Sequence, residues 1–239
     1  MPSYAIIGAS RGIGLEMVRQ LAAHPENTVF AVVRNADTST HLVDFLAGGE
    51  RKNVHVLEGD IIDPAATKAS CYAAAAKVAG ISGGALDVLI HNAAHLNMAT
   101  MYRGFLDYED DDALDKDFMD YFKANALGIV HSMNAFLPLL RNGSAKKVAV
   151  LSSPVGQREL VWNMHMSAAA VYGTSKAAAD MVLTKYAVML EGEGFIITGI
   201  IPGLVDTTDT ATDITLAKAT LEKVLAKMGG GIQAQRRSH

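Results

Sequence analysis

The sequence predicts an α/β fold: a doubly wound parallel sheet of six to seven strands, with helices on both faces in a three-layer α/β/α arrangement. Short apolar, β-branched runs alternate with longer helical stretches along the whole chain. These runs are almost entirely apolar, which indicates strands that are buried on both faces of the sheet. Because no linker, internal repeat or low-complexity block divides the chain, a single domain is expected over residues 1–239, ending in a polar tail at 236–239.

The expected strands are short runs rich in Val, Ile, Leu and Ala, the composition of a buried parallel sheet. In chain order they are Ser3–Ile7, Thr28–Val33, Val54–Leu57, Leu86–His91, Lys147–Ser152 and Phe195–Ile201. A stunted seventh strand is expected at Gly229–Gln235.

The expected helices fill the intervals between the strands. They run over Leu15–Ala23, from about Asp37 to Gly48-Gly49, from Asp63-Pro64 to about Gly80, over about 111–140, over Ala168–Glu191 and over about 214–228. Asp63 suits a helix cap before Pro64, and Asp37 suits a cap of the second helix. The acidic residues Asp110 to Asp112 favour the N-terminus of the helix that begins there.

Composition excludes several functional classes. The 21 basic and 25 acidic side chains give a net charge of −4, so neither a nucleic acid nor an anionic membrane is expected as partner. Half of the residues are hydrophobic, which indicates a folded core rather than disorder. The N-terminus lacks the pattern of a signal peptide, and no run reaches the roughly 18 apolar residues of a membrane span. With Cys71 as the single cysteine, a reducing, cytoplasmic location is expected.

A glycine-rich turn, Gly8-Ala9-Ser10-Arg11-Gly12-Ile13-Gly14, lies between the first strand and the first helix. Glycines there let the backbone bend sharply and approach a diphosphate, which the helix N-terminus stabilises. The spacing is G-x-x-x-G-x-G and differs from the generic G-x-G-x-x-G. A dinucleotide site is therefore expected at this turn.

The same residues also fit G-x-S-x-G, the nucleophile elbow of α/β-hydrolases, with Ser10 as nucleophile. On the first strand, however, no preceding strand and loop could form an oxyanion hole. A hydrolase is therefore kept as the weaker alternative.

Tyr172 and Lys176 stand four residues apart on a predicted helix and so share one face. A cation near a phenol favours the phenolate, which predicts a tyrosine pKa below the usual value of about 10. Such a phenol is suited to donate a proton to a developing alkoxide.

Together these motifs resemble the short-chain dehydrogenase/reductase family over essentially the whole chain. The shared features follow the family's order: the turn at 8–14, Asp60 after the third strand, Asn92-Ala93-Ala94 after the fourth, Asn125 in the long helix, Ser153 after the fifth strand, Tyr172-x-x-x-Lys176, and Pro202 to Thr207 after the sixth. The resemblance is to classical-like members of the carbonyl reductase type, and it implies a Rossmann-type fold.

The resemblance also implies catalytic roles. Tyr172 would be the general acid in reduction and the base in oxidation, and Lys176 would lower its pKa and hold the nicotinamide ribose. Ser153 would bind the substrate carbonyl oxygen, with Ser152 as the alternative hydroxyl. Asn125 would bind a water of a proton relay, or would be a structural polar residue in a helix kink.

The residues at the end of the second strand bear on the choice of cofactor. Arg34 stands where an NAD enzyme usually has an acid, and Arg11 is a second guanidinium at the same end of the site. Two guanidinium groups suit a 2′-phosphate, so NADP(H) is expected. The cofactor-binding residues implied are Gly8, Ser10, Arg11, Gly12, Ile13, Gly14, Arg34, Asp60, Ile61, Asn92, Ala93, Tyr172, Lys176, Pro202, Gly203, Val205 and Thr207.

The expected activity is NADPH-dependent reduction of a ketone or aldehyde, without a metal. The alternative is a cofactor-binding protein of this fold without turnover. The cluster Trp162, Met164, His165 and Met166 is expected to line an apolar pocket, or to be mere loop packing. Beyond the small-molecule carbonyl or alcohol substrate, the expected partner is a second copy of the chain, in a homodimer or homotetramer.

The chain departs from the family pattern in three places. Ile7 stands where a threonine is common, and His91-Asn92-Ala93-Ala94 stands for N-N-A-G. The segment after Thr207 is short, which leaves open how the substrate pocket is closed.

Overall fold

The computed structural model describes the chain except for residues 50, 61–63, 212, 216, 220–221 and 223–239. In the described residues the strands are β1 (Ser3–Ile7), β2 (Thr28–Val33), β3 (Val54–Glu58), β4 (Val88–His91), β5 (Lys147–Leu151) and β6 (Ile196–Ile200). They form one six-stranded sheet in the order β3-β2-β1-β4-β5-β6, with every pair parallel. The predicted doubly wound α/β fold is thereby confirmed.

Seven α-helices lie between β1 and β6 among the described residues, and they connect or flank the strands. They are α1 (Gly12–Ala22), α2 (Thr40–Ala47), α3 (Pro64–Ser82), α4 (Asp111–Phe122), α5 (Gly128–Asn142), α6 (Arg158–Asn163) and α7 (Ala170–Leu190). A π-helical turn at Lys123–Leu127 joins α4 to α5, and 3-10 turns lie at Pro154–Gly156, Glu191–Glu193 and Thr208–Thr210. None of the described helices is both long and apolar enough to span a bilayer.

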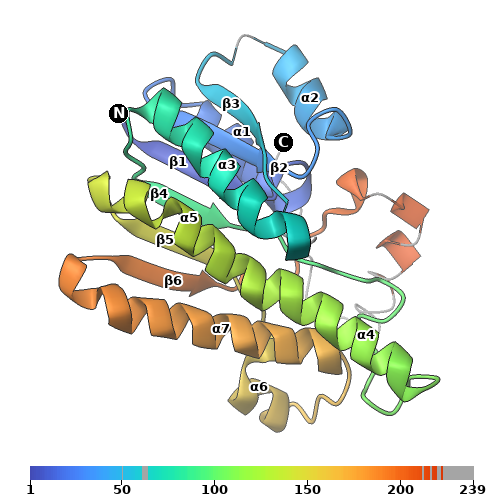
Figure 1. The fold of residues 1–239 in the computed structure, drawn as a ribbon. Coiled ribbons are helices and arrows are strands. Elements are labelled where there is room, and N and C mark those ends of the chain that lie inside the picture. The colour runs from blue at the N-terminus through green and yellow to red at the C-terminus, as the bar shows by residue number, and fades with distance from the viewer. Residues whose placement is uncertain (50, 61–63, 212, 216, 220–221, 223–239) are drawn as a thin grey trace.

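The strand side chains alternate between two cores, as the period of a β-strand requires. Ile7, with alternate residues of the neighbouring strands, packs under α3, α5 and α7. Ile6 points the other way, into a smaller core with Leu15 of α1 and Leu42 of α2. Figure 1 shows the same layers, with α3, α5 and α7 on one face of the sheet and α1 and α2 on the other. The chain therefore reverses its winding between β1 and β4, and doubly wound sheets bind their ligands at the carboxyl ends of the strands at such a point.

The structure corrects several predicted boundaries. The expected helix over 111–140 is α4 and α5, separated by the π turn, and α6 lies in an interval that was expected to be a loop. Asp37 is not a helix cap, because Asn35 holds a turn there: its side-chain oxygen accepts from the Thr38 amide (2.9 Å) and its carbonyl from the Ser39 hydroxyl (2.6 Å). α2 therefore begins three residues later than predicted, at Thr40. Asp110 does cap α4, through a bond from the Ala113 amide (2.7 Å).

The end of the chain is described only in part. Residues 214, 215, 217–219 and 222 are helical, in agreement with the start of the last predicted helix. The proposed seventh strand at Gly229–Gln235, the tail at 236–239 and the Asp63 cap lie outside the described residues. The described sheet ends at β6, whose Ile196 and Ile200 are exposed.

Candidate active site

The glycine turn is closed by the end of β4. Gly8 has φ +86°, and a Cβ there would lie 2.7 Å from the backbone of Ala93. At Gly14 a Cβ would lie 2.1 Å from the Gly8 carbonyl oxygen and 2.6 Å from Asn92 Nδ2. The Asn92 amide donates to that same carbonyl at 2.8 Å. These contacts bring together residues that are 84 positions apart and leave no room for a side chain at Gly8 or Gly14.

The β1–β4 junction also accounts for the first departure from the family pattern. The carbonyl of Ile7 accepts bonds from the amides of Asn92 (3.0 Å) and Ala93 (2.8 Å). The backbone thus holds the Asn-Ala segment to the end of β1, and a hydroxyl at position 7 is not needed for this.

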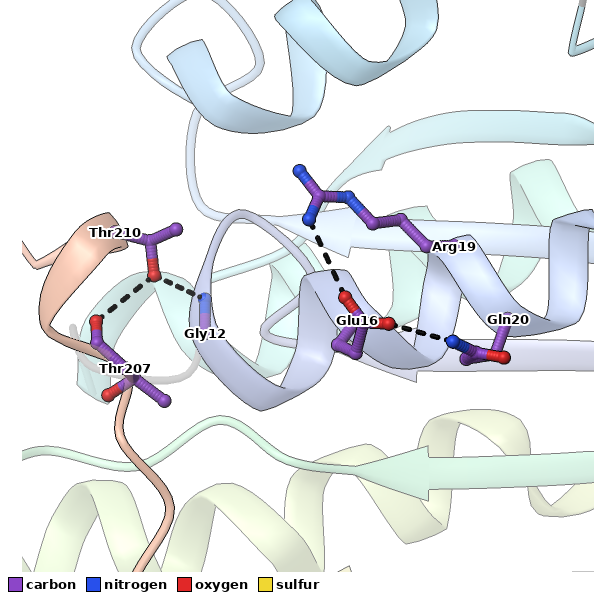
Figure 2. Close-up of polar contacts among 6 residues, drawn as sticks. All are labelled: Gly12, Glu16, Arg19, Gln20, Thr207 and Thr210. Carbon is purple, nitrogen blue, oxygen red and sulfur yellow. Dashed lines mark hydrogen bonds and ion pairs between the residues drawn. The ribbon is translucent and has the colours of Figure 1, made fainter. Parts of the chain in front are cut away.

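The segment after β6 lies on the glycine turn. A Cβ at Gly12 would touch the Thr207 side chain at 3.6 Å. The Gly12 amide, at the start of α1, donates to the Thr210 hydroxyl at 2.9 Å, and that hydroxyl donates to the Thr207 carbonyl at 3.3 Å (Figure 2). Thr210 is buried and was missed by sequence reasoning, because nothing local relates it to a turn 198 residues earlier. It identifies Gly12 N–H as a donor that a polar oxygen can reach.

The two arginines predicted to bind a 2′-phosphate have different surroundings. Arg11 directly precedes α1 and has extended backbone, while Arg34 is exposed after β2. The structure adds Glu58, at the end of β3, which accepts a bond from the Ala36 amide at 3.0 Å. Sequence reasoning missed this carboxylate, which becomes a neighbour of the β2 end only through the pairing of Val33 with Glu58.

Asp60 follows β3, as predicted, and its backbone amide is held by the Ser70 hydroxyl of α3 at 2.7 Å. Ile61, the other residue expected at the adenine, lies outside the described residues. Pro202, Gly203 and Val205 lie in the segment that leads from β6 to Thr207, with Gly203 at φ +74°.

The structure distinguishes the two candidate serines. The Ser152 hydroxyl donates to Asp180 of α7 at 2.6 Å, so it is engaged away from the tyrosine. The Ser153 hydroxyl interacts with the Tyr172 phenol instead, and this hydrogen bond acts to lower the phenol's pKa. A Cβ at Gly156 would lie 2.8 Å from Lys176 Cβ, so the turn after Ser153 packs directly on α7. Ser153 is therefore the hydroxyl that shares a site with Tyr172.

Tyr172 and Lys176 lie on one face of α7, with the ammonium nitrogen 5.9 Å from the centre of the phenol ring. Lys176 is buried, and Nζ donates to the Leu151 carbonyl at 2.7 Å. Burial lowers the pKa of Lys176 to about 8, against the opposing effect of the Asp180 carboxylate. The ammonium remains mostly charged at neutral pH.

The predicted lowering of the Tyr172 pKa is wrong for the free protein. Burial raises the pKa of Tyr172 above its usual value of 10.0, and Tyr102 adds to the increase, while Ser153 opposes it. In the free protein the Lys176 ammonium donates to the Leu151 carbonyl and lies 5.9 Å from the centre of the phenol ring. Tyr172 therefore keeps its proton at neutral pH, as a proton donor must.

Asn125 lies in the π-helical turn, an irregularity that often marks functional sites. Its side-chain oxygen accepts from the His95 amide at 2.7 Å. Its amide donates to the His95 carbonyl at 3.3 Å and to the Ser175 hydroxyl at 3.0 Å. Asn125 thus joins the loop after β4 to α7, which agrees with the structural alternative stated above for this residue.

An aromatic row that the sequence did not indicate leads to Tyr172. The His95 ring meets Tyr121 at 4.8 Å between centroids, and Tyr121 meets Tyr172 at 5.8 Å. Tyr121 is fully buried and accepts a bond from the Asn97 amide at 2.9 Å. No cluster that could hold a metal is found in the part of the chain that the structure describes.

Two further segments carry exposed apolar side chains. The loop after β4 carries Leu96, Tyr102, Phe105 and Leu106, and the segment of α6 carries Trp162 and Met164. The loop after β4 adjoins the start of α7, because the Ala170 amide donates to the Arg103 carbonyl at 2.9 Å, and the α6 segment precedes α7 in the chain. Trp162 is 78% exposed, so it is not packed as a core residue.

Comparison with known proteins agrees with this geometry. Residues 4–219 match the short chain dehydrogenase family. A short-chain dehydrogenase/reductase of Aspergillus aculeatus, AacuF, is 40% identical over 214 residues, covering 88% of this chain and 77% of that protein. The short-chain dehydrogenase/reductase atnB of an Arthrinium species is 38% identical, covering 94% and 82%.

Solved structures give the same result. The NADPH-bound carbonyl reductase from chicken fatty liver has a TM-score of 0.70 at 25% identity, covering 95% of this chain and 87% of that one. The carbonyl reductase Sniffer of D. melanogaster has a TM-score of 0.73 at 22% identity, covering 95% and 92%, and shares the fold. With the family match across most of its length, the chain belongs to the short-chain dehydrogenase/reductase family and is an oxidoreductase of that family.

Proposed function

We propose that the protein reduces a ketone or aldehyde to an alcohol with NADPH, with Tyr172 as general acid. The observation that carries the proposal is that Ser153, which follows β5, meets Tyr172 and Lys176 of α7 at the carboxyl edge of the sheet on which the glycine turn also lies. In a doubly wound sheet, ligands bind at this edge, where the strand order reverses.

The residues present fit a dinucleotide. Because Gly8 and Gly14 have no side chains, a diphosphate can approach the backbone of the turn closely. The Gly12 amide supplies a donor at a helix N-terminus. Since that amide is now bonded to Thr210, a phosphate oxygen there would have to replace the threonine hydroxyl. When bound, the reduced nicotinamide supplies the hydride.

Arg34 and Arg11 support the choice of NADPH, because guanidinium groups bind phosphate by charge-assisted hydrogen bonds. Glu58 opposes this choice near the β2 end, and its carboxylate is engaged by the Ala36 amide. The remaining contacts are assigned to Asp60 and Ile61 at the adenine, Asn92 and Ala93 beneath the cofactor, Lys176 at the ribose, and Pro202, Gly203, Val205 and Thr207 beyond it.

In the reaction, Ser153 binds the carbonyl oxygen and Tyr172 donates its phenol proton to that oxygen as the alkoxide develops. The raised pKa of Tyr172 keeps the proton on the phenol until then. The phenolate that remains is stabilised by the Lys176 ammonium, which is charged below a pH of about 8. Reduction should therefore slow as the pH rises above that value.

The substrate is proposed to be a bulky apolar carbonyl compound. Solvent-exposed apolar side chains on two neighbouring segments indicate a binding surface rather than core. Trp162 and Tyr102, from the α6 segment and the loop after β4, supply its aromatic part.

A homodimer or homotetramer is also proposed. Met119 of α4, together with Met181 and Val188 of α7, exposes apolar surface on helices long enough to pair with a second copy. A cytoplasmic location stays a prediction of the sequence.

The test is NADPH consumption with a panel of carbonyl compounds, comparing wild type with Tyr172→Phe. We expect turnover by wild type and a loss of about 10²- to 10⁴-fold in the variant, the usual contribution of a general acid. NADPH binding, followed by fluorescence, should persist in the variant. If wild type binds NADPH and never oxidises it, the alternative of a cofactor-binding protein without turnover is correct.

A further inference from the structure

A buried carboxylate of α4, that of Asp117, binds the loop that follows β4. Asp117 is 6% exposed. It accepts hydrogen bonds from the Tyr108 phenol (2.6 Å), the Thr100 hydroxyl (3.0 Å) and the Asn97 side-chain amide (3.4 Å). All three donors belong to residues 97–108, between β4 and α4, which we call loop 97–108. Burying a carboxylate is costly unless donors replace its water, so these bonds hold the loop against the helix.

Tyr121, one turn of α4 after Asp117, holds the same loop and also reaches Tyr172. Residues four positions apart share one face of a helix. The Tyr121 phenol oxygen accepts a bond from the Asn97 amide at 2.9 Å, and its ring lies 5.8 Å from the Tyr172 ring. The face of α4 that binds loop 97–108 is therefore the face that meets the proposed general acid.

The middle of the loop lies on the segment that leads into α7. The Arg103 carbonyl accepts a bond from the Ala170 amide at 2.9 Å. A Cβ at Gly104 would lie 3.4 Å from the Ser167 carbonyl oxygen. Since Ala170 stands two residues before Tyr172, the loop is fixed at both α4 and the start of α7.

Tyr102 directly precedes the contact with α7. Its side chain remains partly open to solvent, with the residue 39% exposed. Burial raises the pKa of Tyr172, and the Tyr102 phenol adds to the increase, in agreement with two neighbouring phenols. An aromatic ring that is both exposed and close to the proposed general acid can bind the apolar part of a substrate.

We propose that Asp117 is a positioning residue for substrate selection: it fixes loop 97–108 before the substrate arrives, so that Tyr102 is already placed to contact a bulky carbonyl compound at Tyr172. The selection rests on the proposed function, whereas the fixing of the loop does not. A loop that is already ordered loses little conformational freedom when the substrate binds, and only a substrate large enough to touch the loop gains from this.

The Tyr108 bond can be removed while the buried carboxylate stays in place. Burial raises the pKa of the Tyr108 phenol, and Asp117 adds to the increase, so the phenol keeps the proton that it donates. The Arg103 guanidinium lies 5.3 Å from the centre of the Tyr108 ring, a contact that does not need the hydroxyl. Tyr108→Phe therefore deletes one bond between the loop and Asp117 and keeps the ring. Tyr72→Phe, the same change at an exposed position of α3, is the matched control.

The first measurement requires no activity. Hydrogen–deuterium exchange in loop 97–108 of the free protein should be at least about tenfold faster in Asp117→Leu and in Tyr108→Phe, because bonds to a charged acceptor are lost. Asp120→Leu, which removes a partly exposed carboxylate of the same helix, and Tyr72→Phe should leave this exchange unchanged. If the loop exchanges at the wild-type rate in Tyr108→Phe, the proposal is overturned, whatever the enzyme does and whether or not Asp117→Leu folds.

The second measurement compares a large and a small aldehyde, naphthaldehyde and propanal, at saturating NADPH. In Tyr108→Phe the kcat/KM for naphthaldehyde should fall by about tenfold through KM, because the loop must now be ordered on binding. The kinetic constants for propanal and the affinity for NADPH should equal those of wild type, and Tyr72→Phe should match wild type throughout. Equal losses with both aldehydes, or no loss with either, would make the role of Asp117 structural only and contradict the proposal.

Failure of the proposed function would give a different result. Wild type would then reduce neither aldehyde, while the exchange measurement would be unaffected. Binding of naphthaldehyde to the NADPH complex, followed by the fluorescence of Trp162, the one tryptophan of the chain, should still be about tenfold weaker in Tyr108→Phe. Equal affinity in wild type and variant, or no binding by either, would overturn the proposed selection.

Discussion

The two halves of the proposed site, the glycine turn after β1 and the side chains near the end of β5, differ in the atoms that form them. At the end of β1 lies the glycine turn, in which neighbouring atoms approach Gly8 and Gly14 too closely for a side chain at either position. Near the end of β5, Ser153 and the α7 residues Tyr172 and Lys176 are proposed to act through hydroxyl and ammonium groups; burial raises the pKa of Tyr172 and lowers that of Lys176. Substitutions in the glycine turn should therefore act by steric clash. Substitutions of Ser153, Tyr172 or Lys176 should lower activity and preserve the fold.

The largest effect is expected for Gly14→Ala. The new methyl group would lie 2.1 Å from the Gly8 carbonyl oxygen, so the turn must open. We expect the free energy of unfolding to fall by about 3 kcal/mol, the upper range for overpacking, and NADPH binding to be lost. Denaturant unfolding and NADPH fluorescence measure the two effects. Gly80→Ala is the control, since nothing lies within 4 Å of its Cβ, and it should stabilise α3 by about 0.5–1 kcal/mol. If Gly14→Ala and Gly80→Ala gave equal results, the claim that close packing limits the glycine turn would be wrong.

Two adjacent serines sharpen the comparison on the catalytic side. Ser153→Ala should lower kcat by about 10²- to 10³-fold, the usual loss when one donor to a developing oxyanion is removed, with stability almost unchanged. Ser152→Ala removes a 2.6 Å bond to Asp180, so it should cost about 1.5–3 kcal/mol of stability and retain turnover. Kinetics and thermal unfolding of both variants provide the test. If Ser152→Ala lowered kcat more than Ser153→Ala did, Ser152 would be the hydroxyl that binds the carbonyl oxygen.

The part of the fold that sequence reasoning predicted best is the buried strands. The bounds of β1 and β2 are as expected, because each is an apolar run that is interrupted by polar or turn residues at both ends. The π turn before α5 was not foreseen, because it accompanies contacts of Asn125 with His95 and Ser175, which come from other elements. The six-residue helix α6 is too short to produce a periodic pattern.

The site shows the same division. The order of the motifs along the chain predicted which strand ends carry Asn92, Ser153 and Thr207, since parallel strands bring their carboxyl ends to one edge. The direction of the Tyr172 pKa shift depends on burial, which spacing alone does not reveal. Thr210 was missed for a related reason, because its partner Gly12 is distant in sequence.

The smallest effect concerns cofactor choice at the outer end of the glycine-turn side. Arg34→Ala should lower the ratio of kcat/KM for NADPH to that for NADH by about 10- to 100-fold, since a charge-assisted contact contributes about 1.5–3 kcal/mol. Glu58→Gln is the matched variant: it removes the carboxylate bonded to the Ala36 amide and should raise the same ratio, because one negative charge near the 2′-phosphate is lost. Steady-state kinetics with both cofactors measure the ratio. If Arg34→Ala leaves it unchanged, the NADPH assignment is wrong, and this part of the site, like the glycine turn, selects its ligand by shape rather than by charge.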